Sequence, residues 1–204
     1  MFALVQDNTI TKTISGNRGI TLNDIQYPQN IFTLWSAAER EAIGIYEVVF
    51  DNTNKKDEAY YTNTNQSFAF AGGAVTASYG SATAKSLTDT LFTAQDEIDG
   101  KGTEGEVSAR GLKFQHKERI KQQAAGRLQN TDWYVVRKAD SGTAVPSAIT
   151  TYRAAVRTKS GQMETAIDNA ANVDALAVLY EYVNTGTEEN PVMERPLGEF
   201  PEAV

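Results

Sequence analysis

The sequence contains no cysteine and only one histidine, His116. The absence of cysteine excludes disulfides, thiolate zinc ligands and cysteine nucleophiles. A single histidine excludes metal sites built on two histidines. A Ser-His-Asp triad would have to use His116, yet no serine lies in the Gly-x-Ser-x-Gly context of a nucleophile elbow. We therefore expect no enzymatic activity, no cofactor and no metal ion.

Other binding motifs are missing as well. Gly100-Lys101-Gly102-Thr103 lacks the Gly-x-x-x-x-Gly-Lys-Ser/Thr spacing of a phosphate loop, and no apolar strand precedes it. Residues 51–58 do not supply the alternating Asp/Asn ligands of a calcium loop. Neither pattern predicts a ligand site.

Long apolar runs are also absent. The run Phe2–Val5 ends at Gln6, which is too short for a signal peptide, and no later stretch approaches the ~20 apolar residues of a membrane span. Hydrophobic residues nevertheless make up 41% of the chain, enough for a folded core. We expect a protein made in the cytoplasm, with no membrane partner.

Charge is divided sharply along the chain. Residues 1–109 carry a net charge of −7, residues 110–159 carry +8, and residues 160–204 carry −8. A basic segment between acidic ones fits a nucleic-acid surface or complementary protein contacts. The segment lacks interleaved aromatics and any helix-turn-helix signature, so we expect protein partners and no nucleic acid.

The first 80 residues are typical of β-structure with one short helix. Asp7-Asn8 separates two strands, 2–6 and 9–14, as a two-residue hairpin turn. Ser36 and Glu39 fit a capping box, and Gly44 is placed to end that helix before a strand at 45–50. Further strands are predicted at 20–22, 60–62, 67–71 and 74–79, with Gly72-Gly73 as a turn.

Residues 81–106 predict a different organisation. An amphipathic helix is expected over 86–98, with Leu87, Leu91 and Ile98 near one face, followed by a glycine-rich linker over 99–106. The remaining residues, 107–204, predict helices at 107–128, 133–139, 148–170 and 175–182, with Asp132 and Asp174 as caps, and an extended strap from Asn184. The predicted fold class is therefore α+β, with a β-sheet domain, a linker and an α-helical region.

One helix carries a narrow apolar stripe that repeats every four residues. Its members are Leu112, His116, Ile120, Ala124 and Leu128. Such a stripe is narrower than the face a globular helix normally buries. Two interpretations remain open: packing within the chain, or a seam between copies that resembles a short coiled coil.

Two stretches resemble small proteins of phage tail-gene modules. The first is an N-terminal hairpin and the residues after it, 1–10, 22–28 and 35–49. The second resembles the C-terminal region of tail fibre assembly and tail assembly chaperone-like proteins, through residues 127–137, Gly142, Pro146 and 152–157. The C-terminal extension beyond Lys159 departs from this pattern.

The resemblance implies a protein that binds other proteins of a phage tail and has no catalytic residues. We expect a virion component, located in the tail, that links a fibre or spike to the tail or baseplate and forms a homo-oligomer there. The alternative is a fibre-assembly chaperone absent from the mature virion. The predicted structural anchor is Trp133, buried against Tyr152 and Val156, with Asp132 and Arg153 beside it.

Overall fold

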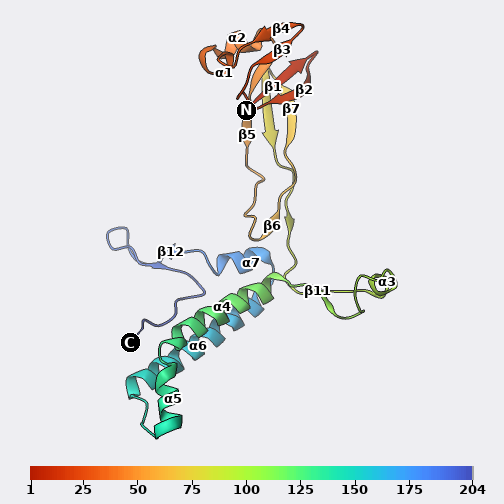
Figure 1. Ribbon diagram of the computed structural model, residues 1–204. Coiled ribbons are helices and arrows are strands. Elements are labelled where there is room, and N and C mark those ends of the chain that lie inside the picture. The colour runs from red at the N-terminus through yellow and green to blue at the C-terminus, as the bar shows by residue number, and fades with distance from the viewer. Residues whose placement is uncertain (204) are drawn as a thin grey trace. The chain divides into compact units, whose positions relative to one another are not determined.

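The protein was analysed as a computed structural model, which describes residues 1–203. The chain divides into two compact units, Met1–Thr83 and Ala84–Val204. The first contains a β-sheet and the second contains the long helices, which confirms the α+β class (Figure 1). Each unit is described by itself.

The first unit begins with the predicted hairpin. Strands β1 (Phe2–Gln6) and β2 (Thr9–Ile14) pair antiparallel. Asp7 and Asn8 have φ values of 49° and 60°, as this two-residue turn requires. The register shifts between Leu4 and Val5, so the pairing contains a bulge at Thr11 of β2.

A second hairpin follows, of which the sequence analysis found only the first strand. It joins β3 (Ile20–Leu22) to β4 (Ile25–Tyr27). Its turn residues Asn23 and Asp24 have φ values of 49° and 62°, which repeats the geometry of the first turn.

Two short helices come next, α1 (Ile31–Leu34) and α2 (Ala37–Glu41), where one was predicted. The Ser36–Glu39 capping box is confirmed, and Gly44 has a φ of +79° as expected at the end of the helical segment.

A five-stranded sheet organises the first unit, in the order β2-β1-β5-β8-β7. Strand β5 (Ile45–Asp51) pairs antiparallel with β1 and parallel with β8 (Ala74–Ser78), which in turn pairs with β7 (Ser67–Ala71). Each face of the sheet carries an apolar cluster, one with Phe2 and Leu4 and the other with Ala3 and Val5. The short strands β6 (Tyr61–Thr62) and β9 (Thr83–Ala84) pair with each other in a separate two-stranded sheet.

The second unit starts with an arm, in which the helix predicted over 86–98 is shorter than expected. The arm consists of β10 (Thr90–Leu91), α3 (Ala94–Ile98) and β11 (Val107–Ala109). Of the predicted helix only its end, Ala94–Ile98, is helical, because short polar side chains before it bind backbone locally, as Ser86 Oγ does with Thr88 O at 2.6 Å. At the start of the predicted linker, Lys101 bridges Asp96 and Asp99 at 3.0 and 2.9 Å.

Four helices follow in the second unit, namely α4 (Leu112–Gln129), α5 (Asp132–Ser141), α6 (Ser147–Asn169) and α7 (Val173–Val178). Helices α4 and α6 lie side by side (Figure 1). Gly142 ends α5 with a φ of +71°. Two predicted caps were wrong: Asp132 is the first residue of α5 with Thr131 at the cap, and Asn172 rather than Asp174 caps α7 by accepting from Ala175 N.

The C-terminal segment contains a small hairpin and then packs on its own unit. Strands β12 (Val183–Asn184) and β13 (Met193–Glu194) pair antiparallel. Beyond them, Leu197 and Phe200 are buried, and Arg127 of α4 stacks over the Phe200 ring at 5.1 Å. The predicted strap therefore covers the protein's own helices.

Candidate protein-interaction surface

The apolar stripe of α4 is buried inside the chain. Leu112, His116, Ile120 and Ala124 are 4%, 6%, 1% and 7% exposed, and Leu128 is half-buried. Helix α6 lies along α4. A stripe that is already covered offers no surface to a second copy, so the burial favours the intrachain interpretation.

Helix α6 supplies the complementary face, and its pattern was visible in the sequence. Its buried residues recur every seven positions in two rows, Ile149, Val156 and Met163 in one and Arg153, Ser160 and Ile167 in the other. A seven-residue repeat is the pattern of helices that pair lengthwise. Only the repeat of α4 was predicted from the sequence, and the matching face of α6 was missed.

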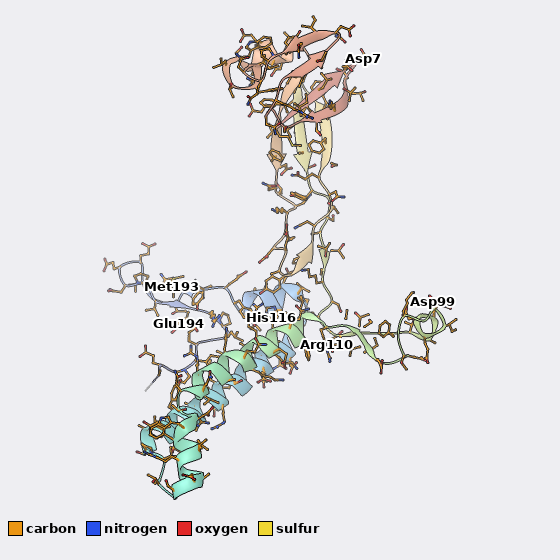
Figure 2. The ribbon with its side chains drawn as sticks, in the orientation of Figure 1. Asp7, Asp99, Arg110, His116, Met193 and Glu194 are labelled. Carbon is orange, nitrogen blue, oxygen red and sulfur yellow. The ribbon has the colours of Figure 1, made fainter. Side chains whose placement is uncertain are left out.

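His116 of α4 packs against the residues that follow α7. Its ring lies 4.8 Å from the ring of Tyr180, centroid to centroid. Burial, and secondarily the charge of Arg119, lowers the pKa of His116 below its usual value. Figure 2 shows His116 on α4 beside α7. The neutral imidazole therefore behaves as a core side chain.

The junction between α4 and α5 is held by Arg153 of α6. This side chain is 9% exposed, and its Nη1 donates to Leu128 O at 2.9 Å and to Thr131 Oγ1 at 2.6 Å. The same nitrogen lies 2.8 Å from Asp132 Oδ1. One guanidinium thus binds the last turn of α4 and the first residues of α5. Arg153 and Asp132, both predicted as anchor residues, are brought together here.

Two other predicted anchor residues are also buried. Tyr152 is 5% exposed and its hydroxyl lies 3.4 Å from Arg127 O, whereas Val156 is fully buried. The structure therefore places the anchor of this region on α6.

Trp133 is not buried, which corrects its predicted role. The residue is 52% exposed, and its ring stacks on Tyr134 at a centroid distance of 4.1 Å. The Arg137 guanidinium lies over both rings, at 4.6 and 5.4 Å. Because Arg153 rather than Trp133 fixes the start of α5, the indole remains on the surface. We call this group of Trp133, Tyr134 and Arg137 the α5 stack.

The surface around the α5 stack is apolar and basic. Val135 and Val136 of α5 are 44% and 65% exposed. A pocket of about 320 Å³ beside Val135 is lined in addition by Lys138, Arg153 and Arg157. Partly exposed tryptophan, tyrosine and arginine are the side chains enriched at binding hot spots. The composition therefore fits a surface that binds protein.

Part of the basic charge of residues 110–159 is compensated within the second unit. Lys117 pairs with Asp168 at 2.8 Å, and Arg110 pairs with Asp89 at 2.5 Å. Both acidic residues come from the flanking segments. Some of the complementarity between the charged segments thus serves intrachain contacts.

Residues 1–203 contain no cluster of three or more His, Asp or Glu side chains that could hold a metal ion. Within the same residues, no helix is long and apolar enough to cross a membrane. A scan against protein-family models, a search of curated proteins and a search of solved structures each find no match. The likeness to phage tail proteins therefore stays a prediction from the sequence.

Proposed function

We propose that the chain is a non-enzymatic structural protein of a phage tail, linking a tail fibre or spike to the tail or baseplate. The observation that carries this proposal is the α5 stack. A tryptophan that is 52% exposed, packed on a tyrosine and an arginine, presents a large apolar surface to water. Burying such a surface against another protein is favourable, at roughly 25 cal/mol per Å² of apolar area.

The stack is also fixed in place, which favours binding. Arg153 ties the first turn of α5 to α4 and α6, and the Arg137 guanidinium covers the indole face. A side chain that is ordered before binding loses less conformational entropy in the complex. The residues involved belong to the stretch that resembles tail assembly proteins, Arg127–Arg137 and Tyr152–Arg157.

The proposal is tested with the phage that encodes the chain. Mass spectrometry of purified virions should detect the protein in a fixed ratio to tail proteins. A Trp133→Ala variant supplied during infection should be incorporated at least tenfold less, since hot-spot truncations cost about 2 kcal/mol or more. Val178→Ala is the matched control, because Val178 is 47% exposed on a different helix and should be incorporated normally.

The outcomes separate the two functions. A protein absent from virions whose loss leaves fibres misfolded would support the assembly chaperone instead. Normal incorporation of Trp133→Ala would show that the α5 stack does not bind the partner.

A further inference from the structure

A groove in the first unit lies between two strands, β2 and β3. Two adjoining hollows of about 520 and 470 Å³ form it. Both are lined by Lys12 and Ile14 of β2, by Ile20 of β3, and by Arg18 from the loop between these strands. We call this feature the β2–β3 groove.

One of the strands that flank the groove has a free edge. Among the described strands, β3 pairs only with β4, whereas β2 pairs with β1 and its other edge lies near β7. Edge strands present unpaired backbone donors and acceptors, which makes them templates for another strand. The bulge at Thr11 contributes here, because it brings Lys12 opposite Leu4 and Ile14 opposite Phe2, residues of one apolar cluster. The groove consequently has an apolar floor.

The groove is also positively charged. Within residues 1–203, neither Lys12 nor Arg18 forms an ion pair. No aspartate or glutamate is among the described residues that line it. An occupant should therefore combine an extended backbone, aliphatic side chains and carboxylates.

The β12–β13 hairpin of the second unit has this chemistry. Val183, Val192 and Met193 are 51%, 49% and 55% exposed. Glu188 and Glu189 lie in the exposed turn of the hairpin, and Glu194 is exposed on β13. Figure 2 shows Met193 and Glu194 on a hairpin that extends away from the helices of its unit. A two-stranded hairpin of this kind is marginal alone and gains stability from a further strand.

We propose that the β2–β3 groove of one copy binds the β12–β13 hairpin of a second copy. A hairpin strand then pairs with a free strand edge, Val192 and Met193 contact the aliphatic floor, and the hairpin glutamates meet Lys12 and Arg18. The two surfaces differ, so the contact is heterologous. Repetition of a heterologous contact produces rings or open filaments.

The test uses two charge-reversed full-length variants and their mixture. Variant one is Lys12→Glu/Arg18→Glu, and variant two is Glu188→Lys/Glu189→Lys. Analytical ultracentrifugation of the unaltered protein at low salt should show association that increases with concentration and weakens as salt screens the charges. Each variant alone should associate at least tenfold more weakly, because groove and hairpin then carry the same sign.

An equimolar mixture of the variants is the decisive sample. Each groove in it meets a hairpin of opposite charge on the other variant, so association should return to the original level. Lys55→Glu/Lys56→Glu and Glu104→Lys/Glu106→Lys are controls with the same net charge changes at exposed residues that belong to neither the groove nor the hairpin, and they should associate normally. Circular dichroism establishes that every variant is folded.

A protein that stays monomeric at several hundred micromolar and low salt would overturn the proposal. So would a mixture that fails to restore association, or controls as defective as the variants. Assembly from repeated copies suits a tail component, and in that respect the proposal rests on the proposed function. The self-association proposal and the proposed function can fail independently, because self-association is measured on purified protein and the tail function is measured on virions.

Discussion

Replacement of Arg153 by Met should destabilise the second unit by about 2–4 kcal/mol. The guanidinium is 9% exposed and donates to Leu128 O and Thr131 Oγ1. Methionine fills a similar volume but donates no hydrogen bond. Two acceptors at the α4–α5 junction then lose a charged donor, and each such loss costs roughly 1–3 kcal/mol when the site stays buried.

The ion pair with Asp132 adds little to this figure. The Asp132 side chain is 56% exposed, so its carboxylate is rehydrated when Arg153 is removed. Exposed pairs of this kind contribute about 0–1 kcal/mol. Asp132→Asn is therefore the matched control, and it should cost less than about 1 kcal/mol.

Urea denaturation measured by tryptophan fluorescence is a suitable assay. Trp35 and Trp133 lie in different units, so a Trp35→Phe background leaves Trp133 as a reporter of the second unit alone. Linear extrapolation then gives the free energy of unfolding for each variant. A cost below about 1 kcal/mol for Arg153→Met, or equal costs for the two substitutions, would refute the anchoring role of Arg153.

Three further predictions concern the same unit. Trp133→Ala should lower the free energy of unfolding by less than about 1.5 kcal/mol, because half of the side chain is already in water. A loss above about 3 kcal/mol in urea titrations monitored by circular dichroism would show instead that Trp133 is a buried anchor. Ile120→Ala should cost about 2–5 kcal/mol in the same titration, and more than Leu128→Ala, because Ile120 is 1% exposed. The pKa of His116 is lowered in the folded state, so the unfolded state binds a proton more readily, and the stabilising contribution should be complete above the ordinary pKa near 6.5 and fall as pH drops from there through the lowered pKa. Urea midpoints measured between about pH 5 and 7.5 should show this dependence on pH. The substitution His116→Phe should remove most of it.

The elements of the first unit that the sequence predicted best depend on local chemistry. The Asp7-Asn8 turn, the Ser36–Glu39 box and Gly44 each act within a few residues, and all three were confirmed. The parallel pairing of β5 with β8 was not predicted, because it joins residues far apart in the chain. Local signals carry no information about such a contact.

In the arm of the second unit, the prediction failed because a local pattern was misread. The spacing of Leu87, Leu91 and Ile98 suggested a helix face, yet Leu91 and Ile98 are 50% and 78% exposed. Helix α3 begins only after Thr93. The backbone N–H of Thr93 donates a hydrogen bond to the Asp96 carboxylate, which lowers the pKa of that carboxyl to about 2. A Thr-x-x-Asp signal was present in the sequence and outweighs the weak apolar spacing.

The candidate site was predicted in part. The size of Trp133 suggested that it is the anchor, whereas hydrogen-bonding capacity determines which side chain is buried at this junction. The Leu128 carbonyl and the Thr131 hydroxyl both accept a hydrogen bond from Arg153, which reaches them from one buried position. The sequence grouped Arg153 with Asp132 and Trp133 as anchor residues but could not show whether Arg153 or Trp133 turns inward.

The parallel seam between β5 and β8 has a consequence for the order of folding. Hairpins such as β1–β2 and β7–β8 close over short turns, which takes about 1–10 μs. The pairing of Val48–Asp51 with Val75–Ser78 must instead close the long intervening segment, and this loss of chain entropy slows the step. Strand β5 also pairs with β1 across a still longer segment, from Phe2 to Glu47, so we expect the hairpins to form first and β5 to join them late in folding.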